Sequence, residues 1–206
     1  MKHEPVVQLL AEAFREDPFF RLMFNDEEWE TKATAMIAFL IRRNELLDGV
    51  LLTDDEAAPS FAAIVEKPAP LRRISLVNRL RLLVEMMKLG LRLPGRILPI
   101  AQQYERIQKQ HLPTEPHYYI TMIGVAASVR GKGVGKRVLQ AVDELAASGP
   151  YPVALDTENE QNVEIYRRLG FTLTGSEKLG DVTMYCMTKP PEKMRNERNG
   201  IRRGNK

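Results

Sequence analysis

The chain has 206 residues, of which 44% are hydrophobic and 28% charged, and its formal net charge is +3. This length allows one globular domain with a buried core, and the composition excludes an intrinsically disordered protein. No apolar run approaches the roughly 18 residues that a membrane-spanning helix needs, and the amphipathic start does not resemble a signal peptide, so we expect a cytoplasmic protein.

The first half of the sequence predicts two amphipathic helices followed by a β-hairpin. Apolar residues recur at helical spacing in both helical segments, and an acidic turn separates the two short strand-like runs. In chain order, the predicted elements are a helix from Val6 to Phe14 that ends at Asp17-Pro18, a helix from an Asn25/Asp26 cap to Gly49, and strands at 50–53 and 61–65.

Two further helices are predicted between the hairpin and the second half. The first is amphipathic from about Ile74 to Leu91, is broken at Pro94-Gly95, and gives way to a helix that runs to about Gln110. Seven Lys and Arg residues lie between 72 and 96 against the single Glu85. A basic amphipathic helix can rest on a membrane surface or on phosphates, but we favour a solvated face here.

The second half has a regular β-α-β-α-β-β order, which favours an α/β fold in the mixed-sheet (α+β) sense, with helices packed on one twisted sheet. A capping box at Thr157 and Glu160 is expected to open its second helix. The predicted elements are a strand at 118–126, a helix through Val134 to Leu145, a strand at 151–156, a helix from Thr157 to Gly170, and strands at 171–176 and 182–187 around a turn at Gly180-Asp181.

Cysteine and histidine are too sparse to suggest redox or metal chemistry. The single Cys186 cannot form an intrachain disulfide, and its strand-like surroundings favour a buried, unreactive thiol. His3, His111 and His117 match no metal-ligand spacing, so we expect no metal site.

A glycine-rich turn between the strand at 118–126 and the following helix carries the strongest functional signal. Such a turn directs backbone N–H groups and the positive end of the helix dipole at one point, and its glycines let a phosphate approach closely. Three basic side chains add positive charge to that point: Arg130, Lys132 and Lys136. The turn therefore predicts a diphosphate-binding site.

Two common nucleotide motifs do not fit this turn. A Walker loop requires glycine where Arg130 stands and a hydroxyl residue where Arg137 stands. The dinucleotide fingerprint beginning at Gly131 and Gly133 requires glycine at position 136, which is lysine.

The segment Arg130-x-x-Gly133-x-Gly135 resembles the Arg/Gln-x-x-Gly-x-Gly/Ala signature of GNAT N-acetyltransferases. Downstream, Asn162-x-x-x-Tyr166-x-x-x-Gly170-Phe171 is similar to a second motif of that family. The resemblance runs from about residue 115 to 189, and within the family it looks most like the puromycin N-acetyltransferase-like members. One departure is Ala127, where many members have proline.

The resemblance implies the GNAT acyl-CoA N-acyltransferase fold, a central mixed sheet flanked by helices, and acetyl-CoA as cosubstrate. It implies that Tyr166 is the general acid that protonates the departing thiolate, and that the Val125 N–H binds the thioester oxygen. The residues expected to bind the cosubstrate are Val125, Arg130, Gly131, Lys132, Gly133, Val134, Gly135, Lys136 and Asn162.

The general base and the acceptor stay open at this stage. Glu115, Asp156 and Glu158 all flank the expected cleft, and water is a further alternative. The resemblance favours a primary amine on a small molecule as acceptor, with no specific nucleic-acid partner and no membrane, and with the protein a monomer or homodimer. A non-catalytic CoA-binding sensor or scaffold is the main alternative, and a nucleic-acid-binding protein is a weaker one.

The predicted domain organisation is one GNAT domain over residues 1–190, followed by a basic, disordered tail over residues 191–206. Residues 1–114 are expected to form the acceptor side and 115–190 the acetyl-CoA-binding core. Seven of the 30 Lys/Arg but only two of the 27 Asp/Glu fall within residues 189–206, so the rest of the chain is slightly acidic. Such a tail can bind polyanions, but we favour a solvated end.

Overall fold

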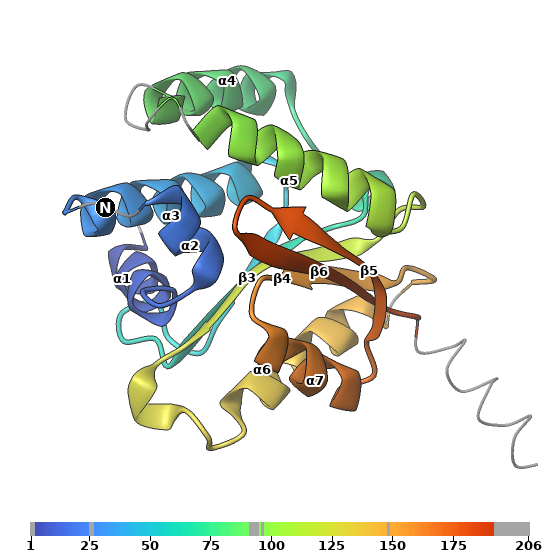
Figure 1. The fold of residues 1–206 in the computed structure, drawn as a ribbon. Coiled ribbons are helices and arrows are strands. Elements are labelled where there is room, and N and C mark those ends of the chain that lie inside the picture. Colours follow the sequence, from blue (N-terminus) through green and yellow to red (C-terminus); the bar gives the residue numbers. More distant parts are fainter. Residues whose placement is uncertain (1–2, 25–26, 91–94, 96, 148, 192–206) are drawn as a thin grey trace, which may run out of the picture.

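The fold is a six-stranded mixed sheet with helices on both faces, seen in a computed structural model that describes residues 3–24, 27–90, 95, 97–147 and 149–191 (Figure 1). Within this part of the chain, no helix has the length and apolar character to cross a membrane. The helices are α1 (Glu4–Ala13), α2 (Pro18–Met23), α3 (Trp29–Leu46), α4 (Leu76–Gly90), α5 (Ile97–His111), α6 (Val134–Ala146) and α7 (Glu160–Arg168). The strands are β1 (Val50–Thr53), β2 (Phe61–Glu66), β3 (Tyr118–Val125), β4 (Val153–Thr157), β5 (Thr172–Leu179) and β6 (Val182–Lys189), with short 3₁₀ turns at Ala69–Leu71 and Ala127–Val129.

The strands lie in the order β1-β2-β3-β4-β6-β5. All neighbours are antiparallel except β3 and β4, which are parallel and are joined through α6. A parallel pair needs such a crossover, and the glycine-rich turn stands where the crossover leaves β3. The predicted α/β fold with a mixed, helix-flanked sheet is confirmed.

Alternation along the central strands divides the core between the two faces of the sheet. On one face, Ala62, Ile64 and Met122 pack against buried residues of α1, α2 and α3. On the other face, Ala63 and Ile120 pack against the apolar stripe of α6. A smaller cluster, formed by Ile107, Leu179, Met184 and Cys186, attaches α5 to the β5-β6 end of the sheet.

Most predicted elements are confirmed within two or three residues, but one short helix was not predicted and one predicted helix cap was wrong. Asp17-Pro18 does more than end the first helix: Asp17 caps a separate short helix, α2, and its side chain accepts hydrogen bonds from the N–H groups of Phe19 and Phe20 at 3.0 and 3.1 Å. Thr157 does not cap α7, because it is the last residue of β4; the cap is Asn159, whose side chain accepts from the Gln161 N–H at 3.0 Å.

Lys189, the first residue of the basic C-terminal stretch, lies in the sheet. Lys189 ends β6, is buried, and donates to Asp143 of α6 at 2.5 Å while lying over the Phe171 ring. It therefore belongs to the packed sheet. The predicted tail beyond Pro191 and the predicted Asn25/Asp26 cap lie outside the described residues.

Candidate active site

The two parallel strands at the centre of the sheet separate and leave room for a site. The ladder between β3 and β4 holds only from Tyr118–Val153 to Ile120–Leu155. At the same level, the pairing of β3 with β2 shifts register, from Val65–Ile120 to Ile64–Met122, so Thr121 is bulged out. Beyond this bulge β3 pairs only with β2, and the carboxyl ends of β3 and β4 are free to border a cavity.

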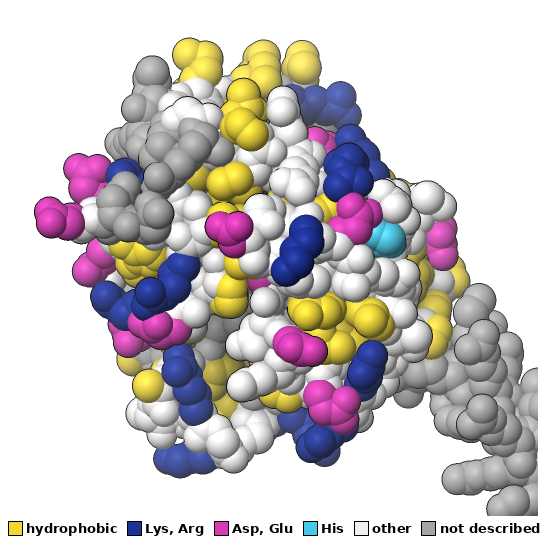
Figure 2. All heavy atoms as spheres, viewed as in Figure 1, with side chains coloured by type: hydrophobic (Ala, Val, Ile, Leu, Met, Phe, Trp, Pro, Cys, Tyr) yellow, Lys and Arg dark blue, Asp and Glu magenta, His cyan; other side chains and the backbone are white. Residues whose placement is uncertain are grey.

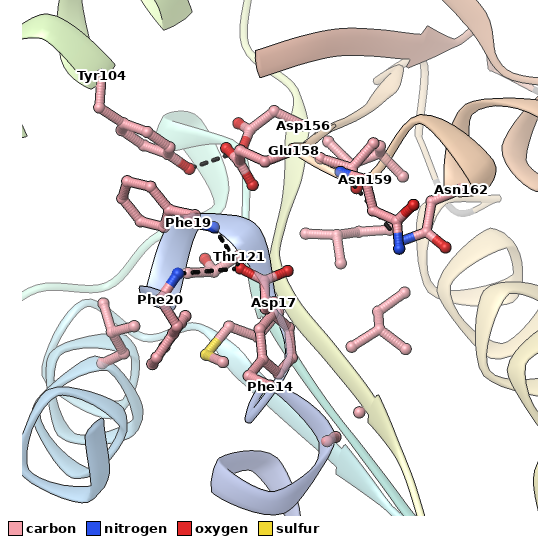
Figure 3. Close-up of a pocket in the computed structure, with 18 of the residues that line it drawn as sticks. Phe14, Asp17, Phe19, Phe20, Tyr104, Thr121, Asp156, Glu158, Asn159 and Asn162 are labelled. Atoms are coloured by element: carbon pink, nitrogen blue, oxygen red, sulfur yellow. Dashed lines mark hydrogen bonds between the residues drawn. The ribbon is translucent and has the colours of Figure 1, made fainter. Parts of the chain in front are cut away.

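A cavity of about 790 Å³ lies in this opening. Its floor is formed by β3 from Ile120 to Val125 and by the end of β4, and α5 closes one side (Figures 1 and 3). The opposite wall comes from the α1–α3 segment and is mainly apolar and aromatic, although the charged Glu16, Asp17 and Arg43 also belong to it. The apolar residues of that wall are Ala13, Phe14, Phe19, Phe20, Met23, Met36 and Leu40.

The glycine-rich turn lies at the end of β3 beside the cavity. Gly131 and Gly133 have φ of 76° and 77°, a left-handed conformation that favours glycine, and nothing lies within 4 Å of a Cβ built at either. Gly133 precedes α6, so the N–H groups of Val134, Gly135 and Lys136 have no partner within the helix. The turn thus presents open backbone donors.

The side chains around this turn differ in their exposure and contacts. Val134 is buried in the core, while Lys132 and Lys136 are exposed. Arg130 folds back, and its Nε donates to the Val125 carbonyl at 3.3 Å. Of the residues expected to bind the cosubstrate, Val125, Arg130 and Asn162 line the cavity, whereas the others lie in the glycine-rich turn and the first turn of α6 and do not line it.

Tyr166 lines the same cavity from α7, one helical turn after Asn162. Its ring packs against Phe171 with centroids 5.8 Å apart. Burial, together with the negative charges of Asp156, Asp17 and Glu158, raises the pKa of Tyr166 to about 12. The phenol is therefore protonated throughout the neutral range and available as a proton donor.

Asp156 ends a hydrogen-bond network on the cavity floor (Figure 3). Its carboxylate accepts from the Tyr104 hydroxyl at 2.7 Å, the Tyr119 hydroxyl at 2.6 Å and the Gln108 amide at 3.0 Å. Burial raises the pKa of Asp156, although these three donors act in the opposite direction. Its oxygens are held in place by residues of α5 and β3.

Glu158 lies next to Asp156 in the cavity lining but differs from it in its hydrogen bonding (Figure 3). Its Oε1 is buried and has no hydrogen-bond partner among the described residues. Burial, then the charges of Asp156 and Asp17, raise the pKa of Glu158 well above its usual 4.5. Asp17 also lines the cavity, and burial raises its pKa too. Three carboxyl groups with raised pKa values thus line one cavity that also has aromatic side chains.

Several of these residues carry no recognisable signal in the sequence. Tyr104 and Gln108 share one helix face by their spacing, but spacing does not reveal what that face meets. That the Tyr119 side chain lies on the cavity floor can be inferred only when the register of β3 is known. Of the three carboxylates considered as bases, Asp156 and Glu158 line the cavity and Glu115 does not.

Metal and thiol chemistry find no support among the described residues. No cluster of three or more His, Cys, Asp or Glu side chains there has a geometry suited to a metal ion. Cys186 is fully buried in β6, and burial raises the pKa of its thiol to about 12, so it is unreactive at neutral pH.

Comparison with known proteins agrees with this geometry. Residues 98–171 match the model of the acetyltransferase (GNAT) family, a segment that runs from α5 through the glycine-rich turn to Phe171. The fold is similar to that of a solved Corynebacterium glutamicum structure described as histone acetyltransferase HPA2 and related acetyltransferase, with 22% identity, 92% of this chain and 91% of that chain covered, and a TM-score of 0.63.

Two curated relatives are longer proteins, and this chain matches only a small part of each. An uncharacterized protein of Mycobacterium leprae is 36% identical over 58 residues, which is 28% of this chain. A probable serine/threonine-protein kinase of Dictyostelium discoideum is 24% identical over 90% of this chain. The matches span 16% and 22% of the lengths of these two relatives. The part of the chain that contains the turn thus matches the acetyltransferase (GNAT) family model, and the fold is similar to that of the solved structure.

Proposed function

We propose that this protein transfers the acetyl group of acetyl-CoA directly to a primary amine of a small molecule. The observation that carries the proposal is that the end of β3, Tyr166 and the three carboxyl groups all border one cavity. Donors for a thioester oxygen, a proton donor and a base then surround the same space. Holding both reactants there removes much of the entropic cost of a bimolecular step.

The cosubstrate pyrophosphate binds at the glycine-rich turn. Open N–H groups at the start of α6 and the positive φ of Gly131 and Gly133 support this placement. From the turn, the pantetheine arm enters the opening between β3 and β4, where Asn162 is within the cavity lining. The thioester then lies beside Val125, whose N–H stabilises the negative charge that develops on the carbonyl oxygen.

Tyr166 protonates the CoA thiolate as it leaves. Its raised pKa keeps the proton on the phenol at neutral pH, and its position on α7 faces the opening that the pantetheine arm occupies. Glu158 takes the proton of the attacking amine. It is preferred over Asp156 because its Oε1 is unpartnered, whereas the Asp156 carboxylate already accepts three hydrogen bonds.

The acceptor carries a positive charge on an apolar or aromatic body. Buried carboxyl groups disfavour their own ionised form, and an alkylammonium ion beside them relieves that cost. The opposite wall, with Phe14, Phe19 and Phe20, gives an apolar body a surface to pack on. The resemblance to puromycin N-acetyltransferase-like enzymes supports the same class, a small amine.

The first experiment is calorimetric titration with acetyl-CoA of the wild type and of Gly133→Glu. We expect micromolar binding that Gly133→Glu abolishes, because a carboxylate at the turn repels the pyrophosphate. Gly90→Glu is the matched control, since nothing lies within 4 Å of its added Cβ at the end of α4. No binding by folded wild type contradicts the proposal.

Acceptors are then screened by release of the CoA thiol, using mono- and diamines with apolar or aromatic bodies. Turnover that requires an amine supports catalysis. Tight acetyl-CoA binding without turnover on any amine supports a non-catalytic CoA-binding module instead. Amides and alcohols of the same body serve as controls, because they lack the cation that the carboxyl groups favour.

A further inference from the structure

Helix α4 presents its apolar side to solvent rather than to the core. Its exposed fractions include 73% for Leu76, 69% for Met87 and 58% for Leu83, whereas a packed amphipathic helix buries such residues. None of its side chains is buried among the described residues. The α4 apolar face consists of Leu76, Val77, Leu80, Leu83, Val84 and Met87.

This face is continuous and points away from the protein. At 100° per residue, its six members fall within an arc of about 120°. The partly buried positions Asn78, Leu82, Glu85 and Leu89 fall on the opposite side, where α4 contacts α3. The apolar side of α4 thus faces solvent, whereas a helix that packs on a core turns its apolar side inward. Contiguous exposed apolar surface of this kind marks an interaction site.

Basic residues border the α4 apolar face on both sides. Arg79 lies on one border, and Arg81 and Lys88 lie on the other. The one acidic residue of α4, Glu85, lies on the α3 side, where it pairs with Lys88 at 3.2 Å. Arg79 and Arg81 form no ion pair within the described part of the chain. In Figure 2, hydrophobic side chains project along the edge where Figure 1 places α4, with Lys and Arg beside them.

The charges distinguish between the occupants that this surface can take. If α4 packs against α4 of a second copy, basic borders meet basic borders in either helix orientation, which disfavours association. An anionic lipid surface complements both features, because acyl chains accept the apolar arc and headgroup phosphates pair with the arginines. We propose that α4 docks this protein, peripherally, on anionic membrane surfaces.

This inference goes beyond the proposed function and does not depend on it. It concerns a face formed by α4 alone, outside the glycine-rich turn and the cavity. A helix of this kind lies in the plane of the interface and does not cross the bilayer.

Flotation of the full chain with vesicles tests the proposal in the absence of acetyl-CoA. We expect binding to vesicles of equimolar phosphatidylcholine and phosphatidylglycerol, weak binding to pure phosphatidylcholine, and loss of binding as salt rises. Leu80→Gln/Met87→Gln is expected to weaken binding about tenfold or more, because it removes two of the inserted side chains. Arg79→Gln/Arg81→Gln is expected to weaken binding only to anionic vesicles.

Two matched controls lie on α7. Ile165→Gln changes another exposed apolar residue, and Arg167→Gln/Arg168→Gln removes another pair of exposed charges; both are expected to bind as wild type does. Three results overturn the proposal. They are no vesicle binding by folded wild type, binding that both α4 variants retain, or a solution dimer that Leu80→Gln/Met87→Gln dissociates.

Discussion

Tyr166 contributes a hydroxyl whose pKa is too high for it to act as a base at neutral pH. Tyr166→Phe removes the proposed proton donor but keeps the ring packed on Phe171. We expect kcat to fall about 10²-fold, within the usual range for a lost general acid, with acetyl-CoA affinity unchanged. Steady-state kinetics and calorimetry on the same preparation measure both. The control is Tyr151→Phe, which removes a hydroxyl that does not line the cavity; an equal loss in the two variants excludes the role.

Glu158 sets the acid side of the pH profile if it is the base. A base must be deprotonated to act, and the pKa of Glu158 is raised by burial and by the charges of Asp156 and Asp17. We therefore expect kcat/KM to fall as pH decreases through a value well above the usual 4.5 of glutamate. In Glu158→Gln this acid limb should disappear, with a loss of about 10²-fold at the plateau.

Glu160→Gln is the matched control for this experiment. Glu160 is exposed in the first turn of α7, two residues from Glu158, and should keep the wild-type pH profile. If Glu158→Gln keeps the acid limb while Asp156→Asn loses it, the base is Asp156. A water-mediated proton path predicts that neither substitution removes the limb.

How far the sequence reveals the site differs from residue to residue. Val125, Arg130, Asn162 and Tyr166 were singled out because their spacing around glycines resembles family motifs, and all four line the cavity. Asp17 was interpreted only as the end of a helix, since its local signal is that of a cap. Its place in the cavity lining depends on how α2 packs against the rest of the fold, a tertiary relation that no local pattern encodes.

At the scale of elements, the two glycines at the start of α6 have different physical requirements. Gly133 has φ of 77°, whereas Gly135 has no positive φ, and neither has a neighbour within 4 Å of an added Cβ. Gly133→Ala should destabilise the fold by about 1 kcal/mol through backbone strain and weaken acetyl-CoA binding. Gly135→Ala should stabilise it by about 0.4–1 kcal/mol through lower unfolded-state entropy.

Urea unfolding and calorimetric titration of both variants test this pair. Because alanine is compatible with the family signature at the position of Gly135, binding of acetyl-CoA should persist there. Equal acetyl-CoA affinity of the two variants would contradict the proposed role of the turn, since the backbone conformation of Gly133 would then not affect cosubstrate binding.

Element prediction succeeds where periodicity and packing agree. The apolar positions of α6 recur at helical spacing and all face the sheet, so the helix and its buried side were both evident. In α4 the same periodicity predicted the helix correctly but not its orientation, because an apolar stripe does not specify what covers it. Only the position of α4 on the outside of α3 shows that the stripe meets solvent.

At the scale of the whole molecule, the charged groups divide by the direction of their pKa shifts. The cavity carboxyls Asp17, Asp156 and Glu158 have raised pKa values, mainly through burial. On the surface, hydrogen bonds from Arg106 and His111 lower the pKa of Glu177, and the Arg73 N–H lowers that of Asp48. A group with a raised folded-state pKa binds protons more tightly when folded, so its contribution to stability declines as pH rises.

The stability curve should therefore peak on the acid side of neutrality. The unfolded-state pKa values are 3.8 for aspartate and 4.5 for glutamate. As pH rises above them, the cavity carboxyls progressively destabilise the fold, until they are also ionised in the folded protein. Toward still lower pH, Asp48 and Glu177 become protonated, and the favourable interactions of their ionised forms with their hydrogen-bond partners are lost. The thermal midpoint should rise as pH is lowered from about 8 to about 5, and fall again in stronger acid.

Glu158→Gln separates this effect from the surface ion pairs. Glutamine keeps the shape of the side chain but cannot ionise, so the variant should be more stable than wild type at neutral pH, and its midpoint should vary less between about pH 5 and 8. Glu160→Gln should follow the wild-type curve. A Glu158→Gln midpoint below that of wild type at neutral pH would mean that the ionised carboxylate is stabilised in the fold, and the raised pKa assigned to it would be wrong. If the variant is instead more stable and inactive, the cavity keeps a destabilising carboxylate because acetyl transfer requires it.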